Sequence, residues 1–381
     1  MANADRARVD RIVADRHVSV DEIKAHPENF GLNSRDILRY DQAGKAQDGL
    51  SKLAEKTKAP TMLLIYKPEA FDGQGRAAIV IGDPDRATNV AVVVPGTSHS
   101  LAEGWLGDAK DPANVYLEME RLGDRNAVYA WMGYDAPDSL TDPRVATTAL
   151  AREGGRQLAS DVNGLRSTAM VSQHYTVIGH SYGSTTVADA AVMGMKTNDV
   201  VLVGSPGTDL ARSAADFHLA SGGHVFVGAT STDPVTHIGA LTSTTPWGPG
   251  ALGADPAVDG FGSTRFHAEV TAITDNANAH SHYFDTGSDS LRSMGLIASG
   301  NGDALQSNEL TAAHRDGLHV PGGLLQPKDL AEVLAGQYAE GTLPQSLLED
   351  LANGNPTRIG RIGGAVGVLV EDIYDDPEFG R

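Results

Sequence analysis

Cysteine is absent from this chain, and no stretch reaches the roughly 18 consecutive apolar residues that a membrane-spanning helix needs. The first absence excludes a disulfide framework, a thiol nucleophile and a cysteine metal site. Residues 1–21 are charged throughout and lack the apolar core of a signal peptide. We therefore expect a cytoplasmic protein, or one that is exported without a cleavable signal peptide.

Basic residues are also scarce, with 30 Lys and Arg against 49 Asp and Glu, which gives a net charge of −19. They are scattered along the chain, so the protein would repel a phosphate backbone. Nucleic acid is therefore not expected as a partner. The 381 residues can bury a large core, and they fit one α/β domain of about 250 residues with extensions.

The most informative stretch lies at residues 174–186. Residues 175–178, Tyr-Thr-Val-Ile, are typical of a strand buried on both faces, and the small residues after Ser184 suit a helix packed closely on a sheet. Between them lies Gly179-His180-Ser181-Tyr182-Gly183, a Gly-x-Ser-x-Gly sequence at the strand-to-helix junction that a nucleophile elbow requires. An ordinary glycine-rich turn is the alternative, since the chain contains 43 glycines. The flanking pattern favours the elbow, with Ser181 as the nucleophile.

Strand-like runs alternate with helical stretches around this elbow, which predicts a mostly parallel sheet with helices on both faces. The runs at 77–81 and 90–94 are joined by the turn sequence Gly-Asp-Pro-Asp, so we expect them to form an antiparallel hairpin at the start of the sheet. The other strands are expected at 62–66, 127–132, 175–178, 200–203, 224–229 and 266–273.

The chain divides into a charged helical lead-in at 1–58, an α/β domain at 59–303 and a helical extension at 304–381. Residues 235–263 interrupt the alternation and are rich in Gly, Pro, Thr and Ser, which is typical of a functional loop or lid. Within this insertion, Trp247 and Phe261 are expected to shape an apolar acyl pocket. The C-terminal helices are expected to pack on the domain, and they also offer a surface for a protein partner.

A serine nucleophile needs a histidine base and a carboxylate that orients the histidine. In a fold of this type the chain order is Ser, then the acid, then His. Asp233 directly follows the strand at 224–229 and is the preferred acid. Asp209, one strand earlier, is the rival, and a turn-capping role for Asp233 is the structural alternative.

The base is expected in the loop after the last strand, which contains both His280 and His282. Their spacing alone does not separate them, because residues i and i+2 in a loop can both reach inward. A metal site is a further possibility, but the chain offers no i, i+4 histidine pair on a helix to support it. We expect no metal and no cofactor. His99 and His180 are expected to line the substrate pocket.

An oxyanion that forms at the nucleophile needs two preorganised donors. The backbone N–H of Tyr182, directly after the nucleophile, supplies the first. The second is expected from the Gly96-Thr97-Ser98 loop, where Thr97 is preferred to Ser98. Ser98 is then expected to line the pocket.

Several of these segments together resemble an actinobacterial α/β-hydrolase family that is catalogued as a domain of unknown function. The matching segments are 82–85, 94–97, 131–137, 179–184, 204–207, 233–234, 253–256 and 280–283. They cover about residues 60–300 in the right order. The resemblance implies an α/β-hydrolase fold and a Ser-Asp-His triad, and it favours His280 as the base, because the family pattern is similar to His-Ser-x-Tyr.

We therefore expect a serine esterase or lipase-like enzyme that acts on a small ester with an apolar acyl group, with Ser181, Asp233 and His280 as its triad. A thioesterase, amidase or peptidase with the same triad is one alternative. A non-catalytic protein of hydrolase fold that binds a partner through residues 304–381 is the other.

Overall fold

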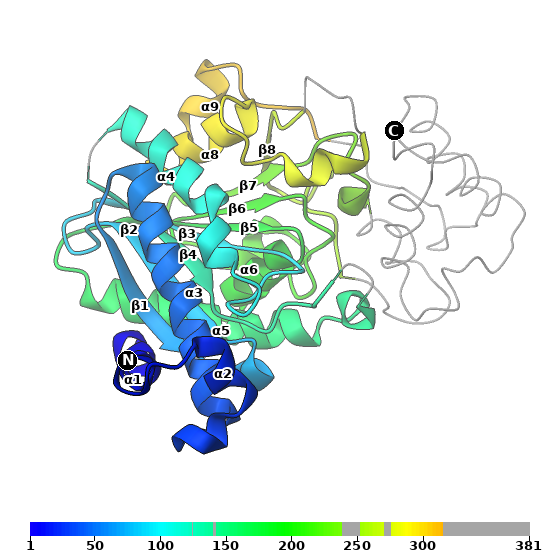
Figure 1. Ribbon diagram of the computed structural model, residues 1–381. Helices are drawn as coiled ribbons and strands as arrows, with labels where there is room; N and C mark the ends of the chain where they lie inside the picture. The colour runs from blue at the N-terminus through cyan, green and yellow to red at the C-terminus, as the bar shows by residue number, and fades with distance from the viewer. Residues whose placement is uncertain (124, 140–141, 238–251, 270–275, 315–381) are drawn as a thin grey trace, which may run out of the picture.

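The computed structural model describes residues 1–123, 125–139, 142–237, 252–269 and 276–314. Within these residues, eight strands form one central sheet in the order β1-β2-β4-β3-β5-β6-β7-β8 (Figure 1). Neighbouring strands run parallel from β4 to β8, and β2 runs antiparallel to both β1 and β4. The mostly parallel sheet with an antiparallel start is therefore confirmed. The strands are β1 (Thr61–Lys67), β2 (Arg76–Gly82), β3 (Asn89–Val94), β4 (Asn126–Met132), β5 (His174–His180), β6 (Asp199–Val203), β7 (Val225–Gly228) and β8 (Thr264–Phe266).

One strand pairing was predicted wrongly. The strands β2 and β3 do not form a hairpin, because β4 lies between them: Tyr129 of β4 pairs with Val80 on one side and with Val92 on the other. After β2 the chain crosses the end of β4, where the Thr88 N–H donates to the Arg125 carbonyl oxygen over 2.7 Å. Both strands are apolar and almost entirely buried, so neither sequence carries an alternation that would identify its partner. The antiparallel neighbours are β1 and β2 instead.

The last strand was predicted too long. It ends at Phe266, and residues 267–269 continue without regular structure. The remainder of that prediction, residues 270–273, lies outside the described residues, as does Trp247 of the predicted lid. Two parts of the predicted lid are described: residues 235–237 belong to a short 3-10 helix, Pro234–His237, and residues 252–263 contain neither helix nor strand.

The helices form layers on both faces of the sheet (Figure 1). On one face α4 packs against α3 and α8, and on the other face α5 packs against α6, which contacts β5 and β6. The prediction of a separate lead-in, domain and extension is untested, because residues 315–381 lie outside the described part of the chain. The helices are α1 (Ala2–Arg16), α2 (Val20–Ala25), α3 (Ser34–Thr57), α4 (Lys110–Leu122), α5 (Ala149–Thr168), α6 (Tyr182–Val192), α8 (Asp289–Ala298) and α9 (Ala304–Ser307).

The N-terminal helices pack on one another beside this sheet. The residue before α3, Asn33, accepts hydrogen bonds from the N–H groups of Arg35 and Asp36 through its side chain. The Asp36 side chain in turn accepts the Asn33 N–H, which completes a capping box. Val9 and Ile23 pack with Tyr40 of α3 in a small apolar cluster. Since α3 also contacts β1 and β2, the lead-in is anchored to the edge of the sheet.

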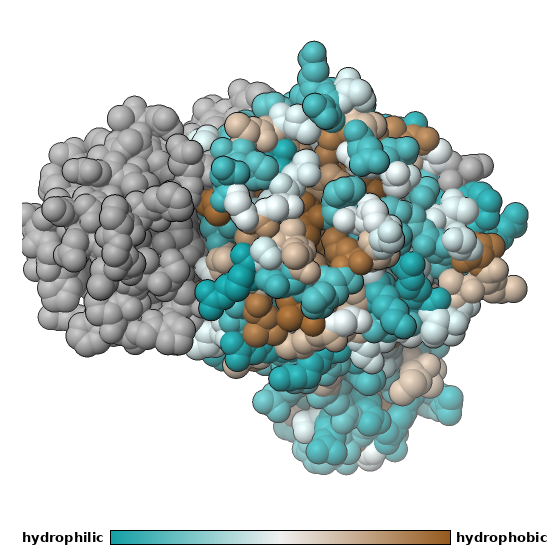
Figure 2. Space-filling view, turned by 180° about the vertical axis from the view of Figure 1, so that it is seen from behind, coloured by the Kyte–Doolittle hydropathy of each residue, from teal (hydrophilic) through white to brown (hydrophobic). Residues whose placement is uncertain are grey.

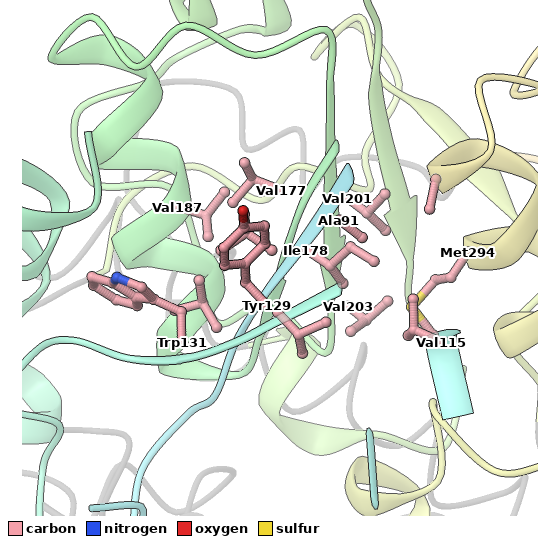
Figure 3. Close-up of a cluster of buried hydrophobic side chains, with 14 of the residues drawn as sticks. Ala91, Val115, Tyr129, Trp131, Val177, Ile178, Val187, Val201, Val203 and Met294 are labelled. Atoms are coloured by element: carbon pink, nitrogen blue, oxygen red, sulfur yellow. The ribbon is translucent and has the colours of Figure 1, made fainter. Parts of the chain in front are cut away.

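Apolar side chains fill both faces of the central strands. Val177 of β5 lies beside Val187 of α6, whereas Val203 of β6 lies toward Val115 of α4 and Met294 of α8 (Figure 3). All of these side chains are buried, and each contributes about 1.5–3 kcal/mol to folding through removal from water. This core fixes the carboxyl ends of β5, β6 and β7, where the polar loops of the site begin.

Among the described residues, none of the helices is both long and apolar enough to cross a bilayer. Polar side chains cover much of the face shown in Figure 2, with apolar ones between them. In the part of the chain that the structure describes, the large exposed apolar side chains are Met1, Met62, Leu64, Leu122 and Met170.

Candidate active site

Ser181 occupies the turn between β5 and α6, and its backbone is strained. Its φ of 54° and ψ of −132° lie in a region that residues with a side chain rarely adopt. A Cβ on Gly179 would lie 2.6 Å from the Ser184 Cα, and one on Gly183 would lie 2.3 Å from the Pro95 carbonyl oxygen. Both distances are too short for a real contact, so only glycine fits at these positions. The turn therefore has the geometry of a nucleophile elbow.

The loop after β3 passes directly beside Ser181. A Cβ on Gly96 would lie 2.6 Å from the Ser181 Cβ and 3.1 Å from its Oγ. The buried Tyr134 holds this loop in place, because its hydroxyl donates to the Pro95 carbonyl oxygen over 2.7 Å. The backbone of the loop is therefore close to any group that bonds to the Ser181 hydroxyl.

The oxyanion donors predicted from the sequence, the N–H groups of Tyr182 and of the loop after β3, lie near Ser181. Tyr182 is the first residue of α6, and N–H groups in the first turn of a helix have no acceptor within that helix. In the β3 loop, Ser98 donates its N–H to the Pro137 carbonyl oxygen over 2.9 Å, so this donor is already engaged. Of the two loop residues predicted from sequence, Thr97 is the better candidate.

Asp233 and His280 form a buried pair at the carboxyl end of the sheet. The Oδ2 of Asp233, on the loop after β7, lies 2.8 Å from the Nδ1 of His280. The same oxygen accepts the Tyr283 hydroxyl over 2.7 Å, and Oδ1 accepts the Val235 N–H over 2.9 Å. Burial alone would raise the pKa of Asp233, but the charge and hydrogen bond of His280 and the two other donors bring this pKa below its ordinary value. Asp233 is therefore an ionised carboxylate that can hold one tautomer of His280.

The other nitrogen of the His280 ring is left without a partner. Nε2 is buried, and it forms no hydrogen bond within the described part of the chain. The centroid of the ring lies 4.7 Å from that of His180, the residue directly before Ser181. A nucleophile and its base often reach hydrogen-bond distance only in the complex with substrate, so this placement suits a base for Ser181.

His180 supports the backbone of His280 rather than acting as a base itself. Its Nε2 lies 2.8 Å from the His280 carbonyl oxygen, to which it donates. Burial, and then the nearby His280, lower the pKa of His180 to about 3. The ring is therefore neutral at physiological pH and adds no positive charge beside His280.

The alternatives that the sequence left open are paired elsewhere. His282 contacts Asp285 through Nδ1, and 37% of its side chain is exposed. Asp209 binds Arg152, whose Nη2 donates to Oδ1 over 3.0 Å. No group of three or more His, Cys, Asp and Glu side chains that could hold a metal ion occurs in the residues described.

The predicted pocket residues are distributed over several places. The His99 ring packs edge-on against Trp105 at 5.9 Å, and its Nδ1 contacts the Thr97 carbonyl oxygen. Phe261 is buried in the core, where its ring packs edge-on against Phe217 at 6.2 Å. Since Trp247 lies outside the described residues, the acyl pocket stays a prediction.

The sequence predicted no role for the side chains of two tyrosines near the site, Tyr134 and Tyr283. The Tyr134 hydroxyl donates to the Pro95 carbonyl oxygen of the β3 loop, and the Tyr283 hydroxyl donates to Asp233. Both lie in segments that carry the family resemblance, which was the only signal that could have marked them. A tyrosine in a loop has no local pattern that reveals the partner of its hydroxyl.

A family model described as an alpha/beta hydrolase matches residues 71–243. Rv2079, an uncharacterized protein of Mycobacterium tuberculosis (strain ATCC 25618 / H37Rv), is 50% identical over 339 residues, which cover 84% of this chain and 51% of the relative. The chain thus spans about half the length of this relative. Rv0963c, an uncharacterized protein of the same strain, is 38% identical over 196 residues, which cover 48% of this chain and 72% of that protein.

Among solved structures, the chain is similar to the esterase LipW from Mycobacterium marinum, with 11% identity and a TM-score of 0.41 over 71% of this chain and 91% of that one. It is also similar to carboxyl esterase 2 from Tuber melanosporum, with 13% identity and a TM-score of 0.39 over 65% of this chain and 89% of that one. Both likenesses are too distant to bear on the substrate.

Proposed function

Because this chain belongs to the alpha/beta hydrolase family, we propose that it is a serine hydrolase that cleaves carboxylic esters through an acyl-enzyme. One observation supports the proposal most strongly: Asp233 Oδ2 lies 2.8 Å from Nδ1 of His280, and the buried Nε2 has no partner among the described residues, while the ring packs 4.7 Å from that of His180, directly before Ser181. A histidine held in this way can accept one proton and return it.

The proposed reaction uses each of these groups in turn. Ser181 Oγ attacks the acyl carbon while its proton passes to Nε2 of His280, and Asp233 stabilises the imidazolium that forms. The N–H groups of Tyr182 and Thr97 donate to the oxyanion, and loss of one such donor costs roughly 3 kcal/mol. His280 then protonates the leaving alcohol. Water, activated by the same base, hydrolyses the acyl-enzyme and restores Ser181.

The strained backbone of Ser181 is consistent with this role. A non-glycine residue at positive φ costs of order 1–3 kcal/mol and is retained where the surrounding structure demands it. Here the surrounding structure is the tight packing of α6 against the end of β3, which only glycine at positions 179 and 183 allows. The result is a serine hydroxyl beside the Gly96 backbone, where an oxyanion would form.

The test is intact-mass labelling with a fluorophosphonate probe on the wild type, on Ser181→Ala and on Ser307→Ala, which changes an exposed serine far along the chain. We expect one adduct on the wild type and on Ser307→Ala, and none on Ser181→Ala. An adduct that persists in Ser181→Ala would contradict the assignment of the nucleophile.

The leaving group is tested by kinetics on an ester, a thioester and an anilide of one acyl group. We expect the ester to give the highest kcat/KM. A preference for the thioester or the anilide would place the enzyme among the thioesterases or amidases, which use the same triad. A folded wild type without adduct and without turnover would favour the non-catalytic binding role.

A further inference from the structure

One oxygen of Asp233 is shared between two side chains. Its Oδ2 lies 2.8 Å from Nδ1 of His280 and 2.7 Å from the hydroxyl of Tyr283. The other oxygen, Oδ1, accepts the Val235 N–H over 2.9 Å. An ionised carboxylate has no proton to give, so both His280 and Tyr283 must donate to it. The Tyr283 hydroxyl is therefore a second donor to the oxygen that orients His280.

The direction of the Tyr283 hydroxyl is determined by a third group. The Thr230 N–H, just beyond β7, donates to the hydroxyl oxygen over 3.2 Å. A backbone N–H cannot accept a hydrogen bond, so the single hydroxyl proton is left for Asp233. The hydroxyl thus links the carboxylate to the end of a buried strand, and rotation of its proton away from Asp233 would break the bond to the carboxylate.

Packing holds the two rings in this arrangement. The rings of His280 and Tyr283 meet at 89° with their centroids 6.5 Å apart. A Cβ on Gly204, at the end of β6, would lie 2.9 Å from both His280 Cε1 and Tyr283 Cε2. The ring of His180 lies against them at 4.7 Å and 5.9 Å. Neither ring has room to turn away from Asp233.

The local turn explains why His280 and Tyr283 face the acid while His282 does not. The His282 N–H donates to the Ala279 carbonyl oxygen over 3.2 Å, which closes a tight turn. Residues three apart in such a turn project to the same side, and the two residues between His280 and Tyr283 are more exposed than either. His282 accordingly reaches Asp285 instead.

Given the proposed serine hydrolase function, on which this inference rests, we propose that Tyr283 is a positioning residue: its hydroxyl aims the Asp233 carboxylate at His280 and takes up part of its negative charge. Loss of the hydroxyl would loosen the carboxylate and lower kcat. It would also leave more negative charge facing His280, which favours the protonated ring. The acid limb of the activity profile would then move to higher pH.

In the described part of the chain, titratable side chains on neighbouring segments also lie beside this cluster. On the β5 side lies His180, which is neutral. On the β7 side lies Glu269, whose carboxylate accepts the Thr230 hydroxyl over 2.8 Å and lies 3.6 Å from Arg265. Neither group changes in a Tyr283→Phe variant, so a shift of the acid limb would report the lost hydroxyl.

The experiment compares Tyr283→Phe with Tyr175→Phe. Tyr175 is also buried, and its hydroxyl donates to Gln173 at the opposite end of β5 over 2.8 Å. For Tyr283→Phe we expect kcat to fall roughly 10- to 100-fold with little change in KM, and the acid limb of kcat/KM to rise by roughly 0.5–1 pH unit. For Tyr175→Phe we expect wild-type kcat and an unchanged limb.

Three outcomes would overturn the role of Tyr283: wild-type kcat and pH profile in Tyr283→Phe, a lower kcat without any shift of the limb, or equal losses in both variants, which would indicate destabilisation alone. Failure of the proposed function is distinguishable, because the wild type itself would then show neither turnover nor fluorophosphonate adduct.

If Tyr283→Phe does not fold, a measurement on the wild type still tests the proposed role of Tyr283. In proton NMR of ¹⁵N-labelled protein, we expect a downfield His280 Nδ1 proton with a nuclear Overhauser effect to a slowly exchanging hydroxyl proton. A His280 Nδ1 proton without such a hydroxyl neighbour would contradict the shared carboxylate oxygen.

Discussion

Two aspartates near the elbow are equally buried but differ in charge. Asp233, after β7, and Asp189, on α6, are both fully shielded from solvent. Asp233 accepts three hydrogen bonds, and its pKa lies below the ordinary value. Asp189 accepts one, from the Leu210 N–H over 3.2 Å, while its Oδ2 has no partner in the described residues. Burial, and then the charge of Asp209, raise the pKa of Asp189 to about 7.

Burial alone therefore does not decide whether a carboxylate in this protein is charged. The neighbouring charges and hydrogen-bond donors decide: the charge of His280 and three donors offset the desolvation cost at Asp233, whereas the charge of Asp209 adds to it at Asp189. At Asp233 two donors come from the loop of His280 and Tyr283 and a third from the adjacent Val235 N–H, so it is a charged group that can orient His280. Asp189 accepts only the Leu210 N–H among the described residues, so its ionisation opposes folding.

The largest expected difference is in catalysis. Asp233→Asn should lower kcat by roughly 10⁴-fold, because an amide in place of the carboxylate favours the wrong tautomer of His280. Asp189→Asn makes the same change at the other aspartate and should leave kcat within about twofold, since Asp189 contacts none of the reacting groups. Steady-state kinetics on a chromogenic ester, with circular dichroism to verify folding, measure both. A comparable loss in the two variants would remove the distinction between the aspartates.

Ionisation of Asp189 should affect the free energy of unfolding with the opposite sign to ionisation of Asp233. The unfolded carboxyl ionises near pH 4, whereas the folded one ionises near pH 7. Between these values the folded state retains a proton that the unfolded state has released, so the wild type loses stability as pH rises. Asp189→Asn should therefore raise the free energy of unfolding by roughly 2–4 kcal/mol near pH 8 and have little effect near pH 4.

Urea unfolding at a series of pH values measures this difference. Asp233→Asn is the matched control and should destabilise the protein at neutral pH, because the favourable ionisation of Asp233 is lost. An Asp189→Asn variant that is no more stable than the wild type near pH 8 would mean that Asp189 is not a buried charge.

The donors of Asp233 can be disturbed without a change to the carboxylate. Gly204→Ala would place a Cβ 2.9 Å from both the His280 and Tyr283 rings, and should lower kcat by roughly 10- to 100-fold through misplacement of the base. Gly194→Ala is the control: its φ of 92° imposes similar backbone strain to the 58° of Gly204, but its Cβ would meet nothing within 4 Å. It should lose stability only, which thermal unfolding measures. Wild-type kcat in Gly204→Ala would show that the rings can move freely.

The smallest expected effect concerns the charges around Asp189. Arg152 pairs with Asp209 and lowers the pKa of Asp189, but 45% of its side chain is exposed. Arg152→Gln should lower the free energy of unfolding near pH 8 by roughly 0.5–1 kcal/mol. Because exposed charges are screened, this loss should shrink at high salt. A loss that does not depend on salt would indicate packing rather than charge.

The elbow was predictable because all of its determinants are local. A strand, two glycines around a serine and a helix of small residues lie within about a dozen positions, and the steric clashes that exclude other residues occur inside this segment or against the β3 loop. The antiparallel partner of β2 was not predictable, because two apolar strands buried on both faces offer no pattern by which to choose between neighbours.

The same limit applies to the histidines. The spacing of His280 and His282 left both open, and the resemblance favoured His280 without a physical reason. The structure supplies that reason through the turn at Ala279, the close packing of Gly204 against the His280 ring and the hydrogen bond from His180. Each comes from the tertiary contacts of this loop.

By itself, the sequence determined a mostly parallel α/β sheet, a strained serine at a strand-to-helix turn and the chain order of a serine, an acid and a histidine, because periodicity and glycine spacing act over short distances. Only the tertiary structure decided which carboxylate carries a charge, which histidine faces it and what Tyr283 does. Those outcomes depend on hydrogen-bond donors from segments up to 50 residues apart in the chain, and no local pattern records which of these segments will meet.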